Sequence, residues 1–197
     1  MSAQAGAATI GALVVPLPAG VVLLDGARAP SDLRAWLGRL QGRRSDPFPA
    51  GQGICWRPSP ASFTLVARGE IDGRPVPVGY ATAGLYSDPD DMQLHVKFLF
   101  VDSRARLDGV GQRLGDALAG VVVAALAQAR ERDGHLAPIG IHVAADTQSE
   151  GGRRIVRAID AMAQTGLAEL RGEAAWQSAG IMAAEGLFPE DAPDFAF

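Results

Sequence analysis

The residues best suited to chemistry lie in one short segment, Arg106-Leu107-Asp108-Gly109-Val110-Gly111-Gln112. An apolar run typical of a buried strand ends just before it, and a long amphipathic helical pattern follows it. Glycines let a backbone approach a ligand closely. The first N–H groups of a helix have no intrahelical partner and carry about half a positive elementary charge. The segment therefore predicts an anion site suited to a pyrophosphate. The alternative, that the glycines only permit a tight turn, stays open.

Two better-known phosphate loops fit this segment less well. A Walker loop ends in Gly-Lys followed by Ser or Thr, whereas Gln112-Arg113 follows Gly111 here. A dinucleotide fingerprint follows the first strand of its domain and needs a third glycine, and Gly115 lies one place late for that spacing. An NAD(P)-binding oxidoreductase that uses Gly109, Gly111 and Gly115 is therefore kept as a third hypothesis.

Local signals along the chain predict an α/β (α+β) fold in a single domain over residues 1–197, with a mixed, mostly antiparallel central sheet flanked by helices. The turn signals include Asp72-Gly73. Within residues 93–102 the alternation predicts Leu94, Val96, Phe98 and Phe100 on one face of a strand. Strands are expected over residues 10–17 (continued by 21–24), 62–70, 76–86, 93–102, 138–145, 167–171 and 176–184, and helices over residues 31–42, 111–132 and 147–165.

The loop and the strand before it resemble the signature of the Gcn5-related N-acetyltransferases, which is Gln/Arg-x-x-Gly-x-Gly/Ala after a strand ending in Leu-x-Val. This chain has Leu99-Phe100-Val101 and then Arg106-x-x-Gly109-x-Gly111. The order of expected elements from residue 62 to residue 184 is also similar to that family. The resemblance implies acetyl-CoA, or another acyl-CoA, as cofactor and an N-acyltransferase activity.

The resemblance also implies where the cofactor lies. The pyrophosphate would lie on the amides of the loop, and the pantetheine would pair with the backbone of the preceding strand, from which the strand at 138–145 would splay away. A backbone N–H near Leu99 would polarise the thioester carbonyl. Many family members have Gly and a basic residue where this chain has Leu107 and Asp108, so Asp108 adds negative charge there. The predicted cofactor-binding residues are Leu99, Val101, Arg106, Asp108, Gly109, Val110, Gly111 and Gln112.

Acyl transfer to an amine needs a group that removes a proton from the amine. Family members often use a His or carboxylate on the central strands as base and a Tyr in the last helix as acid. The candidate catalytic residues here are His95, Glu70 and Ser149. A structural hydrogen bond is an equal alternative for His95, and His142 on the next strand is read mainly as a structural residue. No tyrosine follows the glycine loop, although a thiolate with a pKa of about 8.5 can leave without a dedicated acid.

Composition narrows the remaining classes of function. The formal net charge of −4 argues against a general nucleic-acid binder. Cys55 is the single cysteine, which fits a reducing, cytoplasmic compartment. We expect no metal site and no membrane association, and the sequence leaves a homodimer open. The first hypothesis is an N-acetyltransferase that acts on a primary amine of a small molecule or protein. The second is a non-catalytic acyl-CoA sensor or partner domain of the same fold.

Overall fold

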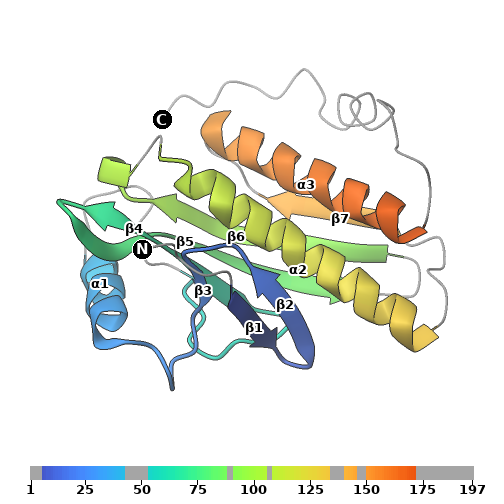
Figure 1. The fold of residues 1–197 in the computed structure, drawn as a ribbon, viewed down its shortest axis with the longest axis horizontal. Helices are drawn as coiled ribbons and strands as arrows, with labels where there is room; N and C mark the ends of the chain where they lie inside the picture. Colours follow the sequence, from blue (N-terminus) through green and yellow to red (C-terminus); the bar gives the residue numbers. More distant parts are fainter. Residues whose placement is uncertain are drawn as a thin grey trace.

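The computed structural model describes residues 6–42, 53–87, 91–105, 108–133, 140–145 and 150–171. A five-stranded sheet has the order β3-β4-β5-β6-β7, in which β3 to β6 are antiparallel neighbours and β7 runs parallel to β6. This confirms the predicted fold class of a mixed, mostly antiparallel sheet with flanking helices (Figure 1). The strands are β3 (Val21–Leu23), β4 (Phe63–Ile71), β5 (Arg74–Ser87), β6 (Asp91–Val101) and β7 (Gly140–Ala145), and the helices are α1 (Ser31–Gly42), α2 (Val110–Asp133), α3 (Glu150–Arg171) and the 3₁₀ turn η1 (Ser103–Ala105).

Each face of the sheet has its own core. On one face α2 and α3 lie side by side (Figure 1), and α2 buries Leu114, Leu118, Val121 and Val122 as its periodicity predicts. On the other face α1 packs Trp36 and its leucines against Tyr80 and Val66. α2 is long and apolar enough to cross a membrane, because a stretch of it has a mean hydropathy of 1.4. Half of that stretch is buried inside the protein. The core contacts of α2 account for its apolar residues.

The Asp72-Gly73 turn is confirmed. Both residues have positive φ, 52° and 72°, and Ile71 pairs with Arg74 directly across them. This geometry is that of a two-residue hairpin turn with two left-handed residues, for which Asp-Gly is a favoured pair. The turn sets the register of β4 against β5 as far as the pair Arg68 and Pro77, beyond which Val78 is an extra residue on β5 and shifts it.

The N-terminal region differs from the single strand predicted over residues 10–17. It forms a separate hairpin of β1 (Gly6–Ile10) and β2 (Leu13–Leu17), and β3 pairs with β4 instead of continuing it. Gly11 has a φ of +64°, which glycine adopts without strain and which turns the chain back. The hairpin packs on α2, and Gln128 Nε2 donates a hydrogen bond to Ala12 O at 3.2 Å. The apolar run therefore covers a helix instead of joining the central sheet.

The predicted faces of β6 are wrong beyond Val96, because the strand contains a β-bulge. Thr82 pairs with Phe98 and Ala83 with Val96, so Lys97 is an extra residue without a partner on β5. The insertion exchanges the two faces. Leu94 and Val96 pack towards α2, and so do Leu99 and Val101, whereas Phe98 and Phe100 lie on the face covered by α1.

The last helix is longer than predicted. α3 continues to Arg171, so the strand expected over residues 167–171 is wrong, and the one over residues 176–184 lies outside the described residues. Gly166, the residue after the predicted end of the helix, lies where α3 crosses α2 and contacts Val123. Ile159 and Ala163 are buried, whereas Met162 is 40% exposed. The tertiary contact of Gly166 overrides its usual role as a helix terminator.

Replacing Gly166 by alanine should lower the free energy of unfolding by about 1–3 kcal/mol, because the core becomes overpacked. The added Cβ would overlap Val123 Cγ2 and lie 3.3 Å from Val123 Cγ1, and a valine in a helix strongly prefers one χ1 rotamer, so turning it away costs free energy. Urea unfolding measures the change. Val123→Ala should cancel most of it in a double-mutant cycle. Additive effects of the two substitutions would contradict the contact.

Candidate functional site

The beginning of α2 carries amide groups that no carbonyl of the described backbone accepts. Arg113 N donates the first intrahelical hydrogen bond, to Gly109 O at 3.0 Å, so Gly109 is the N-cap. Among the described residues the amides of Val110, Gly111 and Gln112 have no backbone acceptor. Gly109 has a φ of +69°, and nothing lies within 4 Å of the position of its missing Cβ. The Asp108 side chain is exposed, and Arg106 lies outside the described residues. The helix start therefore offers three donors and open space to an anion.

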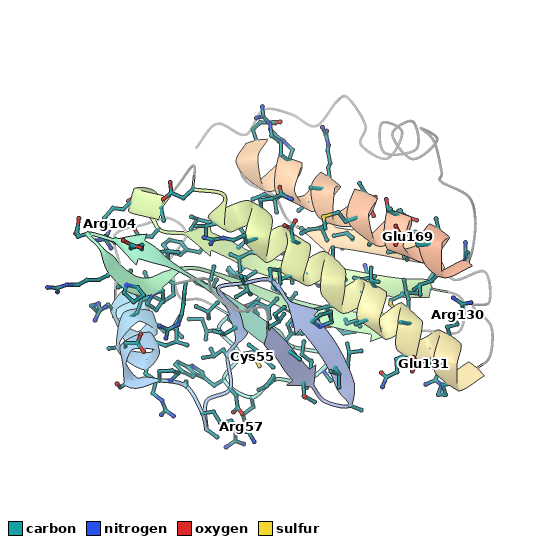
Figure 2. The ribbon with its side chains drawn as sticks, viewed as in Figure 1. Cys55, Arg57, Arg104, Arg130, Glu131 and Glu169 are labelled. Atoms are coloured by element: carbon teal, nitrogen blue, oxygen red, sulfur yellow. The ribbon has the colours of Figure 1, made fainter. Side chains whose placement is uncertain are left out.

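A buried carboxylate holds the chain that leads to α2. Asp102 is 5% exposed, and its Oδ1 accepts hydrogen bonds from Arg104 N and Arg104 Nε at 3.1 Å while Oδ2 accepts one from Arg104 Nη2. These contacts with Asp102 raise the pKa of the Arg104 guanidinium. Asp102 N donates to Val78 O at 2.8 Å, which ties the turn η1 to β5. Figure 2 shows Arg104 at the end of the molecule where α2 begins, with Arg130 and Glu131 at the other end.

The other glycines of α2 have a packing role. A Cβ on Gly111 would lie 2.7 Å from Ile155 Cδ1, and one on Gly115 would lie 3.3 Å from Ile155 Cγ2 and 3.4 Å from Ile159 Cγ1. Both glycines therefore let α3 approach α2. A dinucleotide site needs its third glycine and a mostly parallel sheet. α3 packs against Gly115, and β6 with β7 is the one parallel pair among the described strands, so the geometry disfavours the oxidoreductase hypothesis.

Near this helix start, where a Cβ on Gly111 would lie 3.9 Å from Val101 Cγ2, one edge of β6 has no strand beside it among the described residues. β7 pairs with β6 from Asp91 only as far as Val96, and among the described residues no strand pairs with that edge over residues 97–101. Peptide groups alternate between the two sides of a strand. Asp102 N points to β5, where it bonds Val78 O. The amides of Val101 and Leu99 therefore point to the open side. The open edge is defined here as residues 97–101 of β6 on the side of β7.

The structure separates the candidate catalytic residues. His95 is half-buried, pairs with Gly84 on β5 and Ala144 on β7, and lies where β7 ends its pairing with β6. Glu70 pairs with Pro75 at the tip of the β4–β5 hairpin and is exposed. Nine residues of β5 separate these positions, which is roughly 30 Å. His95 and Glu70 are not brought together, and Ser149 lies outside the described residues.

Two side chains that the sequence did not single out share the face of His95. Tyr86 Oη and Lys97 Nζ each donate a hydrogen bond to Ala61 O at 3.3 Å. That carbonyl oxygen lies over Gly84, which pairs with His95. Only the strand pairing and the bulge bring these residues together, so the sequence held no local signal for them.

His142 belongs to a different group, at the far end of β7 from the open edge. Its Nε2 lies 3.5 Å from Asp91 Oδ1, and its side chain is 64% exposed. Gln164 on α3 donates a hydrogen bond to Ile141 O at 3.1 Å. Burial raises the pKa of the nearby Asp160 carboxyl, and the charge of His142 and a hydrogen bond from Gln164 oppose this rise. The group fastens α3 to β7, in line with the structural role expected of His142.

A cavity of about 650 Å³ lies between α1 and the β4–β5 hairpin and is lined by Trp36, Arg39, Arg74 and Arg104 among others. None of the predicted site residues lines it. Within the ranges that the structure describes, no three His, Cys, Asp or Glu side chains gather as metal ligands. The geometry that can hold a ligand at the predicted residues is thus the helix start together with the open edge.

No family model and no curated protein matches the chain. Solved structures similar to it include a ribosomal-protein-alanine N-acetyltransferase from Brucella melitensis (22% identity, 71% of this chain and 88% of that one, TM-score 0.40). Others are the aminoglycoside acetyltransferase AAC(6')-Iy in complex with a CoA bisubstrate analogue (20%, 71% and 87%, TM-score 0.39) and an acetyltransferase from Trypanosoma brucei (19%, 66% and 82%, TM-score 0.36). At identities below 25% and TM-scores below 0.5, these likenesses carry no argument about function, which rests on the geometry above.

The raised pKa of Asp160 gives a pH-dependent prediction. Between the ordinary aspartate pKa of 3.8 and the higher folded value, the folded state binds more protons than the unfolded state, so stability falls as pH rises through that window. Asp160→Asn should therefore need a higher urea concentration to unfold than wild type at about pH 7, and this gain in stability should vanish at about pH 4. An equal gain at both pH values would contradict a charge effect.

Glu150→Gln is the matched control for Asp160→Asn. Arg153 and Arg154 lower the pKa of Glu150, so this carboxylate stabilises the folded state above its unfolded pKa. The control should lose a little stability near neutral pH and converge with wild type in acid. The two substitutions thus have opposite signs in the same helix.

Proposed function

We propose that the chain is an N-acyltransferase of the Gcn5-related N-acetyltransferase superfamily that uses acetyl-CoA or another acyl-CoA. One observation carries the proposal: the open edge of β6 lies beside the start of α2, where Gly111 approaches Val101, and among the described residues neither has a backbone partner. An acyl-CoA combines a pyrophosphate with an amide-bearing pantetheine arm, so one ligand would match both parts. The amides of Val110, Gly111 and Gln112 would hold the pyrophosphate, and the backbone of Leu99 and Val101 would pair with the arm.

The chain's own groups supply the proton transfer and the polarisation. When bound, the acyl-CoA supplies an acyl group activated as a thioester. The Leu99 N–H faces the open edge, where it can donate a hydrogen bond to a carbonyl oxygen. His95 lies at the point where that edge begins and accepts the proton that the acceptor amine loses. The amine nitrogen bonds the acyl carbon, the carbon–sulfur bond breaks, and the sulfur leaves as a thiolate that takes a proton from solvent.

A non-catalytic acyl-CoA sensor of the same fold is the second candidate, because no tyrosine follows the glycine loop. Release of free thiol in the presence of an amine distinguishes the two, since a sensor binds acetyl-CoA without turnover. Cytoplasmic localisation, a single domain over residues 1–197, a homodimer and the role of Ser149 stay predictions. The half-buried Cys55 (Figure 2) fits a reducing compartment.

Removing one amide from the helix start tests the cofactor site. Gln112 occupies the third position of α2, where its N–H bonds no backbone carbonyl among the described residues, and Gly111 before it has no Cβ to clash with a proline ring. Gln112→Pro should weaken acetyl-CoA binding by about 10- to 100-fold, as expected for a lost hydrogen bond to a charged group. Isothermal calorimetry measures the affinity.

Gln112→Ala is the control, because it also loses the side-chain hydrogen bond to Asp116 but keeps the N–H. It should bind within about twofold of wild type. Thermal unfolding of both variants checks that α2 stays folded. No heat from wild type with acetyl-CoA would sink the proposal, and equal affinities for the two variants would show that the helix start does not hold the phosphates.

Replacing His95 tests the base. His95→Gln should lower kcat by about 100- to 10,000-fold, the usual contribution of a general base, with unchanged acetyl-CoA affinity. The sequence's other candidate, Glu70, is changed to Gln in parallel, and its distance from the open edge predicts little effect on kcat. A loss of kcat on Glu70→Gln but not on His95→Gln would reverse the assignment.

A further inference from the structure

The face of the sheet opposite α2 carries a polar cluster beside the open edge of β6, formed by Tyr86, His95 and Lys97. Tyr86 Oη and Lys97 Nζ share one acceptor, Ala61 O, at 3.3 Å each. A Cβ on Gly84 would overlap this oxygen, so glycine is what lets the loop lie flat over the sheet here. Gly84 pairs with His95, and its neighbours Ala83 and Leu85 face α2. The three side chains therefore surround one point on the face away from α2.

The charge of this cluster is positive. Lys97 is the single lysine of the chain. Its ammonium is exposed and its hydrogen bond goes to an uncharged carbonyl oxygen. Over the part of the chain that the structure describes, no carboxylate forms an ion pair with it. β6 carries one described acid, Asp91, six residues before Lys97 and beside His142, and Asp102, which follows β6, is bonded to Arg104. Among the described residues, an acceptor that reaches His95 therefore meets an ammonium group with no carboxylate paired to it.

We infer that Lys97 binds a carboxylate of the acceptor, so that the acceptor is a small molecule with an amine and a carboxylate a few bonds apart. This inference rests on the acyltransferase function proposed above. His95 and Lys97 are two residues apart on β6, about 7 Å along the strand. That spacing suits an amino acid, with its amine at His95 and its carboxylate at Lys97. A polycationic amine would meet like charge at this position.

The same ammonium also favours the reactive form of the amine. A cation near an amine disfavours its protonated state, and only the neutral amine has a lone pair for attack. Phe98, 38% exposed on the same face, offers an apolar surface to the rest of the acceptor. Lys97 is thus a specificity-determining residue, and Tyr86 supports it through the shared carbonyl.

Matched acceptors test the inference. Thiol release from acetyl-CoA is measured with each of the standard amino acids and with the corresponding amino-acid amide, which keeps the amine but has no carboxylate. For the amino acid that reacts best, kcat/KM should exceed that of its amide by about 10- to 100-fold. In Lys97→Met this ratio should fall towards one, and Lys97→Arg should restore part of it. Because salt screens exposed charges, the ratio should also fall with ionic strength in wild type, which needs no variant.

Arg74→Met is the control, since it removes an exposed cation at the tip of the β4–β5 hairpin and should leave the ratio unchanged. Calorimetry with acetyl-CoA is run on every variant. Amides that react as well as the acids, or a ratio unaffected by Lys97→Met, would overturn the inference while leaving the acyltransferase intact. Acetyl-CoA binding without turnover of any acid or amide overturns it too and favours the sensor. If acetyl-CoA does not bind, the proposed function itself is wrong.

Discussion

The extra residue in β6 is the constraint on which the candidate site depends. Lys97 has no partner on β5, so the strand changes faces at this point. Before the bulge, β6 pairs with strands on both edges, and after it no described strand pairs with the edge towards β7. A bulge increases the local twist and re-aims the residues that follow it. One insertion thereby sets the direction of the Leu99 and Val101 amides and the position of Lys97 beside His95.

The helix start depends on contacts that serve folding first. Asp102 fixes the turn after β6 through Arg104 and Val78, and Gly109 reverses the chain with a positive φ. Gly111 and Gly115 let α3 pack on α2. The glycines that first indicated a phosphate loop thus differ in what requires them. Gly109 has a positive φ, whereas Gly111 and Gly115 leave room for α3. Of these three glycines only Gly109 has open space around it, so the proposed anion site would consist of backbone amides and not of a glycine-rich cradle.

The sequence predicts correctly those elements whose structure depends on residues close together in the chain. The Asp72-Gly73 hairpin, the start of α1 at Ser31 and the amphipathic α2 depend on neighbouring residues, and the structure confirms them. Predictions failed where a contact between residues far apart in the sequence determines the structure. Gly166 continues a helix because of Val123, and the faces of β6 depend on its pairing with β5. Tyr86 and Lys97 meet at a carbonyl from a third segment, which alternation along one strand cannot reveal.

The open edge also separates the two cofactor classes that share a pyrophosphate. Peptide groups on an open edge present unpaired donors and acceptors, and they are satisfied by water or by an added strand-like segment. A dinucleotide has two ribose groups around its pyrophosphate, and the carboxamide of its nicotinamide is a single group on a ring that cannot pair along such an edge. The pantetheine arm has amides spaced along an extended chain, so it can pair with Leu99 and Val101 as a strand does. The helix start alone would accept either ligand, and it is the edge of β6 beside it that favours the acyl-CoA.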